Sequence, residues 1–178
     1  MRRATPLLIF AFAACADGAL APSESASFAR IHDAEDSHGG TPMMVVLVPG
    51  EEPNPPGGDP GENPRGVMVM TLNSGQEQIC FKTSFSGLSS TVSNAHIHIG
   101  PSREAGPVVV PLADPAWPAV SEGTVARCVF APREVIKAIR KNPGDYYVNI
   151  HTRNTGLIPE VGRPGGAIRG QLFKTQGS

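Results

Sequence analysis

Three histidines and one arginine in the carboxyl-terminal half of the chain have the residue types and spacing best suited to chemistry. His96 and His98 form a His-x-His pair, His151 closes a later apolar segment, and Arg169 lies in a third such segment. Imidazole nitrogens are good ligands for copper and zinc, and three of them with one open position can hold a single ion. The pattern predicts a metal site formed by His96, His98 and His151, with copper as the candidate ion.

The alternation of side chains along a strand predicts that these four residues face the same way. Successive side chains of a strand point to opposite faces of the sheet. The apolar faces of the three segments comprise Ala95, Ile97 and Ile99, then Tyr146, Val148 and Ile150, and finally Ile168, Gly170 and Leu172. Packing them into a core turns the imidazoles and the guanidinium outward. Two interpretations stay open: a shared metal site, or histidines that hydrogen-bond loops covering the sheet.

The segments that would position these residues are short and separated by turn-forming residues. The 178 residues include 20 glycines and 18 prolines, which disfavours long helices, while 40% hydrophobic residues can supply a core. One helix is expected after Pro132, ending at Asn142-Pro143. We therefore predict an all-β fold, an antiparallel Greek-key-like sandwich or barrel of seven to eight strands with one short helix. It would occupy residues 43–174, followed by a tail at 175–178.

Charge and hydropathy exclude two classes of protein. Fifteen Lys and Arg against 16 Asp and Glu give a net charge of −1, and the basic residues form no cluster, which argues against nucleic acid as the partner. No apolar run approaches the roughly 20 residues that a membrane-spanning helix needs. Contact with a membrane is therefore expected only through an attached lipid.

The amino terminus has the pattern of an export signal at residues 1–21, followed by a polar tether at 22–42 that includes His32 and His38. Arg2 and Arg3 precede a short apolar run at 7–14. Two processing interpretations stay open. Residues 19–21 (Ala-Leu-Ala) resemble a signal-peptidase site, and residues 12–15 (Phe-Ala-Ala-Cys) resemble a lipobox whose Cys15 would carry the lipid. Either predicts a secreted or cell-envelope protein.

The three cysteines divide in a way that fits an exported protein. Cys80 and Cys128 lie in strand-like segments of the folded part, where an oxidising compartment permits a disulfide. Redox catalysis is the poorer interpretation because the two form no Cys-x-x-Cys motif. Cys15 is then left over at the end of the apolar run, to be lipidated or removed with the signal.

Four blocks of the sequence, in order, resemble the signature of the CHRD (chordin) domain family, which also occurs in exported bacterial proteins. The blocks are 95–100 (AHIHIG), 106–110 (GPVVV), 147–152 (YVNIHT) and 165–172 (GGAIRGQL). The resemblance covers about 45–174 and departs in a longer segment at 153–164. Bacterial members often have a cysteine pair placed like Cys80 and Cys128, which implies a disulfide here. The family carries no settled biochemical role.

The His-x-His strand and the closing Gly-Gly-x-Ile-Arg-x-Gly segment are also similar, more weakly, to copper–zinc superoxide dismutase. That resemblance implies that His96 and His98 are copper ligands and that Arg169 attracts an anion. The bridging histidine and the zinc-site aspartate of that enzyme have no counterpart in this sequence.

Two functions follow as expectations. The first is an extracytoplasmic module that binds an as yet unidentified ligand or protein partner, with no enzymatic activity assigned. The alternative is a copper-binding protein, superoxide-dismutase-like in its activity, that uses the three histidines.

Overall fold

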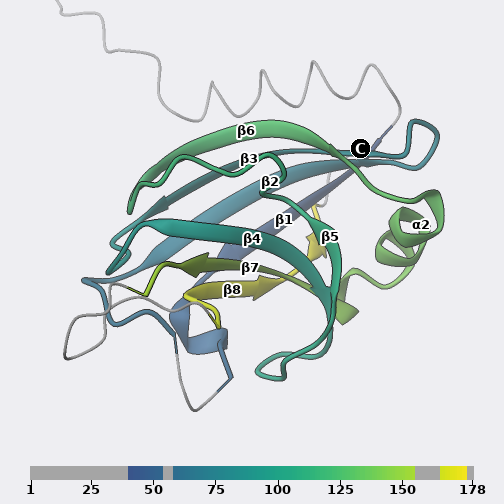
Figure 1. The fold of residues 1–178 in the computed structure, drawn as a ribbon. Coiled ribbons are helices and arrows are strands. Elements are labelled where there is room, and N and C mark those ends of the chain that lie inside the picture. The colour runs from purple at the N-terminus through teal and green to yellow at the C-terminus, as the bar shows by residue number, and fades with distance from the viewer. Residues whose placement is uncertain (1–39, 54–57, 155–164, 176–178) are drawn as a thin grey trace, which may run out of the picture.

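A computed structural model describes residues 40–53, 58–154 and 165–175. Two antiparallel β-sheets pack face to face, and the helix α2 (Arg133–Lys141) lies at one end of the sandwich (Figure 1). The export signal, the tether up to residue 39, Cys15 and the end of the tail lie outside the described residues. Among the residues described, no helix has the length and apolarity to cross a membrane.

The larger sheet has five strands in the order β6-β3-β2-β1-β9. Their bounds are Gly123–Phe130 for β6, Gln78–Ser86 for β3, Arg65–Asn73 for β2, Thr41–Leu47 for β1 and Phe173–Lys174 for β9. All neighbouring pairs are antiparallel, and β1, β2 and β3 follow one another as a meander. In β3, buried and partly exposed residues alternate strictly, as expected where one face of a strand packs on a core.

The smaller sheet has four strands in the order β5-β4-β7-β8. Their bounds are Val108–Pro111 for β5, Val92–Ile99 for β4, Tyr146–Thr152 for β7 and Ile168–Gln171 for β8. The chain leaves β3 for β4 and β5 of this sheet and then returns as β6 to pair with β3, which is a Greek-key connection. It crosses once more so that β7 pairs with β4.

The structure confirms the predicted fold class, an all-β sandwich with one α-helix. The core holds the predicted apolar faces, including the fully buried Ala95, Ile97, Val148 and Ile150. Ile99 differs, since it is 38% exposed at the end of β4. Nine strands are described rather than seven or eight. The last predicted strand divides into β8 in one sheet and β9 in the other, with Leu172 between them.

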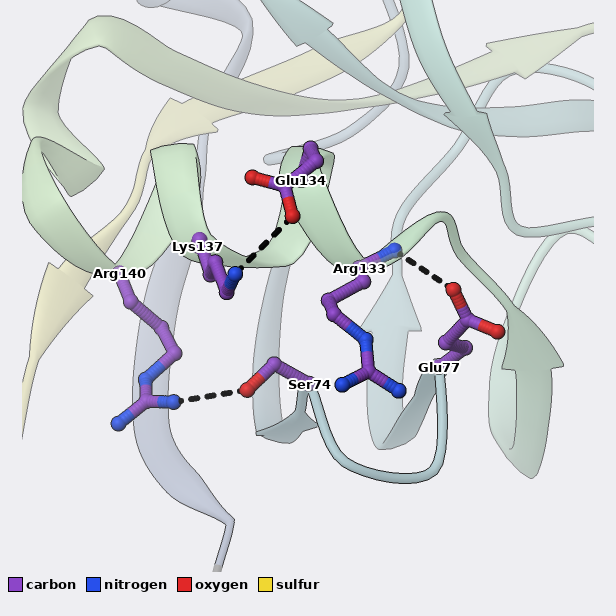
Figure 2. Close-up of polar contacts among 6 residues, drawn as sticks. All are labelled: Ser74, Glu77, Arg133, Glu134, Lys137 and Arg140. Carbon is purple, nitrogen blue, oxygen red and sulfur yellow. Dashed lines mark hydrogen bonds and ion pairs between the residues drawn. The ribbon is translucent and has the colours of Figure 1, made fainter.

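Helix α2 is held against the turn that joins β2 to β3 (Figure 2). Pro132 precedes its first residue at the N-cap position, and Ile136 and Ile139 are buried in the core. The backbone N–H of Arg133 donates to Glu77, and Arg140 donates to Ser74. The helix ends at Lys141 because Asn142-Pro143 follows, and the 3-10 turn η2 (Pro143–Asp145) leads directly into β7.

The two sheets meet where β8 approaches the carboxyl end of β1. Val48 and Arg169 exchange both backbone hydrogen bonds across this junction, with N···O distances of 2.9 and 3.2 Å. Gly170 allows the approach, because a Cβ at that position would lie 1.9 Å from the carbonyl oxygen of Val46. The glycine of the closing segment is therefore needed for sheet closure.

The predicted disulfide is confirmed. Cys80 on β3 and Cys128 on β6 are directly opposed in the antiparallel pair, and their sulfur atoms are bonded. The bond links residues 48 positions apart and fastens the edge strand β6 to the larger sheet.

Candidate metal centre

The three predicted ligands lie together on the face of the smaller sheet that is turned away from the core. His96 and His98 stand on β4 and His151 on β7, and one nitrogen from each lies within 4.8 Å of the other two. The ring centroids are 5.1 Å apart for His96 and His151, 5.5 Å for His96 and His98, and 6.0 Å for His98 and His151. The alternation of side chains along each strand predicts that the three histidines face the same way. The pairing of β4 with β7 brings them close together.

The strand register explains which histidines are neighbours. His151 pairs with Asn94 and His96 pairs with Asn149, so His96 and His151 are diagonal neighbours on one face. Diagonal neighbours are within reach of long or aromatic side chains. His96 Nδ1 lies 3.2 Å from His151 Nε2, so one of the two nitrogens carries a proton that the other accepts. This contact joins the two strands through side chains of the site.

His98 is held in a single tautomer by a covering loop. Its Nδ1 lies 2.8 Å from the carbonyl oxygen of Gly106. A carbonyl can only accept a hydrogen bond, so Nδ1 carries the proton and a neutral ring has its lone pair on Nε2. That Nε2 atom is buried and has no hydrogen-bond partner. A buried, unpartnered imidazole lone pair on a side chain only 7% exposed is an observation that calls for a ligand.

The electrostatics favour neutral imidazoles. Burial lowers the pKa of His96 below its usual 6.5, and the neighbouring His98 lowers it further. Burial also lowers the pKa of His98; its bond to Gly106 acts in the opposite direction, and the charge of Arg169 adds to the lowering. Neutral imidazole is the form that binds metal ions, so burial keeps His96 and His98 in the competent state.

Tyr147 and Arg169 support the site from the adjacent strands. The Tyr147 ring stacks on His98, with centroids 4.8 Å apart and planes 7° from parallel. The guanidinium carbon of Arg169 lies 3.3 Å from the centroid of the same ring. Arg169 is fully buried, and its terminal nitrogens donate to the backbone carbonyls of Pro101 and Glu104. Its guanidinium therefore holds the β4–β5 loop, and one of the same nitrogens also donates to Gln171 on β8.

A buried carboxyl group lies on the same face. Glu52, just after the 3-10 turn η1 (Pro49–Glu51), accepts a hydrogen bond from Asn149, with 3.4 Å between Nδ2 and Oε2. Burial raises the pKa of Glu52 to about 7, against the lowering effects of Arg169 and of the Asn149 bond. Gly166 makes room, because a Cβ there would lie 2.5 Å from the Glu52 carboxylate.

Sequence reasoning located the histidines and Arg169 on one face but missed three of their neighbours. Glu52 lies in a stretch rich in proline and glycine that gives no periodic signal. The alternation places Tyr147 on the outer face, yet nothing in the sequence shows its stacking on His98. Gly106 stands in one of the resembling blocks and acts through its backbone alone, so its residue type gives no signal of that role. The anion-attracting role of Arg169 stays a prediction, and Cys15 lies outside the described residues.

The donor set fits a copper or zinc ion. All three donors are imidazole nitrogens, which suit both metals. The Nε2 atom of His98 has no hydrogen-bond partner, so its lone pair is available to bind such an ion. Metal–nitrogen bonds of about 2.0–2.1 Å place two ligands of a tetrahedral ion about 3.3 Å apart, close to the separation between His96 and His151. A pair as far apart as 4.8 Å would have to close by about 1.5 Å.

Comparison with known proteins identifies the family. A family model described as the CHRD domain matches residues 44–172, which include every strand of the smaller sheet and all three histidines. No curated protein and no solved structure matched the chain.

Proposed function

The chain belongs to the CHRD domain family, and from that premise we propose that it is an extracytoplasmic binding module whose ligand is a copper ion held by His96, His98 and His151. The single observation that carries the proposal is the buried Nε2 of His98. It has no hydrogen-bond partner and stands among two further imidazoles. A purely structural histidine in such a place would be expected to use both ring nitrogens.

Each histidine has a definable part in this proposal. His98 offers Nε2, because its Nδ1 proton is engaged by Gly106. His96 and His151 offer the two nitrogens that now share a proton, which the ion would displace. His96 is the most accessible of the three and would lie on the side from which an ion enters. Bound copper would supply a redox-active ion, and no catalytic step is assigned to the protein.

Copper is preferred to zinc for a thermodynamic reason. Divalent copper binds a given set of nitrogen donors more tightly than the other divalent first-row metals, zinc included. No thiol or carboxylate belongs to the three-ligand group, which leaves a purely nitrogen donor set among the described residues. Zinc therefore serves as the competitor in the test.

The compartment forms part of the proposal. The disulfide between Cys80 and Cys128 supports an oxidising location, where such bonds persist. The export signal at 1–21 and a lipid on Cys15 are consistent with that location. Mass spectrometry of the mature amino terminus tests them: a lipidated Cys15 supports the anchor, and a terminus beyond Cys15 rejects it.

Isothermal titration with Cu(II) tests the proposed function. We expect one ion per chain, with an affinity that falls at least tenfold in His98→Ala and withstands competition by zinc. The matched control is the double variant His32→Ala/His38→Ala, which removes the two histidines outside the site and should keep the tight ion. Equal binding by wild type and His98→Ala, or loss of the tight ion in the control, would reject the proposal.

A further inference from the structure

We propose that Tyr147 is the positioning residue for His98: it fixes both the imidazole ring and the backbone carbonyl that sets the tautomer of that ring. The inference deepens the proposed function and rests on it for the part that concerns metal affinity. Its structural part concerns the metal-free protein and can be tested there.

Tyr147 contacts His98 and its hydrogen-bond partner at the same time. Its hydroxyl oxygen accepts a hydrogen bond from the backbone N–H of Gly106, with an N···O distance of 2.9 Å. The carbonyl of that same residue accepts the Nδ1 proton of His98 at 2.8 Å. The phenol and the imidazole therefore hold the two polar groups of one glycine. The stacking of the two rings restrains His98 in a second direction.

Arg169 binds the rest of the β4–β5 loop. It stands on β8, on the other side of Tyr147 from His98. In the sheet order, β7 with Tyr147 lies between β4 with His98 and β8 with Arg169. The two terminal nitrogens of Arg169 donate to Pro101 and Glu104, at 2.9 and 3.0 Å. The loop is thus held at its start, near its middle and at Gly106.

Only glycine can occupy the end of this loop. A Cβ on Gly106 would lie 1.7 Å from the carbonyl oxygen of Ile99, so a larger residue would push the loop away from β4. The close approach brings the Gly106 carbonyl within reach of His98. Glycine at this position, the tyrosine hydroxyl and the arginine fork are parts of one arrangement that leaves a single lone pair, on Nε2, on a ring that lies beside His96 and His151.

The consequence for metal binding follows from tautomer chemistry. The hydrogen bond made by one ring nitrogen decides which nitrogen is left to bind a metal. Groups that orient a ligand in this way typically contribute 10- to 100-fold to metal affinity. If Gly106 is released, the proton of His98 can move to Nε2, and the ring can turn on its own axis. The free lone pair is then no longer fixed toward the other two ligands.

Tyr147→Phe is the decisive variant, because it deletes one oxygen and keeps the ring that stacks on His98. The matched control is Tyr146→Phe, the same deletion on the neighbouring residue, whose side chain packs into the core. Long-range ¹H–¹⁵N correlation spectra of the metal-free proteins report the tautomer of His98. We expect wild type and Tyr146→Phe to show the Nδ1–H form, and Tyr147→Phe to show a mixture of the two tautomers.

Cu(II) titration of the same proteins gives the second readout. Affinity should fall 10- to 100-fold in Tyr147→Phe and change less than twofold in Tyr146→Phe. Arg169→Met, which keeps the buried stem but removes the loop contacts, should change the spectrum in the same direction as Tyr147→Phe. Circular dichroism shows whether Arg169→Met still folds. If it does not, the result for Tyr147→Phe decides the positioning role by itself.

The proposed copper binding and the positioning role of Tyr147 can fail separately. A wild-type protein that binds no copper rejects the proposed function, and the tautomer spectra then decide the positioning role by themselves. A Tyr147→Phe protein that keeps His98 entirely in the Nδ1–H form overturns the positioning role, whatever its affinity for copper.

Discussion

His96 Nδ1 and His151 Nε2 lie 3.2 Å apart, although the two residues are 55 positions apart in the chain. That separation suits a shared proton, and it also suits two ligands of one tetrahedral ion, which lie about 3.3 Å apart. The pair can therefore accept either species without a large movement of the strands. Protons and metal ions should compete for these nitrogens.

This competition predicts how copper binding depends on pH. Burial lowers the pKa of His96 and His98 below 6.5, so both rings stay neutral under conditions in which a solvent-exposed histidine begins to take up a proton. We expect the Cu(II) affinity to be nearly constant from pH 8 to 6.5 and to fall only at lower pH. Competition titrations across this range, on the His32→Ala/His38→Ala background, measure it. A decline that begins above pH 6.5 would contradict the neutral, buried site.

The buried carboxyl group of Glu52 should make the stability of the fold depend on pH. The sign is opposite to that of copper binding: stability should fall as the pH rises. The pKa of Glu52 is about 7 in the folded protein and 4.5 in a model peptide, so the folded state holds a proton that the unfolded state releases between these values. This contribution is full below pH 4.5 and is lost as the pH rises toward 7, in total roughly 3 kcal/mol. Glu52→Gln removes the dependence, so its stability relative to wild type should rise by that amount between pH 4.5 and 8.

Urea unfolding at the two pH values measures the Glu52 effect. Glu134→Gln, on the exposed surface of α2, is the control and should change the unfolding free energy by less than about 0.5 kcal/mol at either pH. If Glu52→Gln and wild type differ by the same amount at both pH values, the carboxyl group is not protonated by burial.

The close approach of Gly170 to β1 allows the contribution of the β1–β8 junction to the unfolding free energy to be measured. In Gly170→Ala the new Cβ would lie 1.9 Å from the Val46 carbonyl oxygen, so one strand has to move. We expect a loss of about 3 kcal/mol in unfolding free energy, at the upper end for overpacking. Gly144→Ala, where a Cβ would meet nothing within 4 Å, is the control and should stay within about 0.5 kcal/mol. Equal stability of the two variants would show that the junction is easily displaced.

The sequence predicts the face of the sheet to which the three histidines point, but it does not predict the distances between them. The period of two places His96, His98 and His151 opposite a buried apolar face, and the structure keeps this placement. Which strands are neighbours is decided by long-range pairing, and the pairing of β4 with β7 places Asn149 beside His96. Glu52 enters from a loop whose path has no periodic pattern, so no rule of alternation could have found it.

The sequence also did not predict that the outer face of the smaller sheet is buried. All seven residues of β7 are buried, because covering segments lie over the side that alternation assigns to polar residues. The guanidinium of Arg169 accordingly donates to backbone carbonyls of one of these loops. The two interpretations of the histidines also combine in the structure: His98 bonds to a covering loop through one nitrogen and leaves the other without a partner.

Electron paramagnetic resonance of the protein loaded with one equivalent of Cu(II) tests the central claim most directly. We predict hyperfine splitting from three imidazole nitrogens in wild type, reduced to two in each of His96→Ala, His98→Ala and His151→Ala and unchanged in His32→Ala/His38→Ala. Identical spectra for wild type and the three single variants, or a spectrum altered only in the double variant, would contradict a copper ion held by these residues.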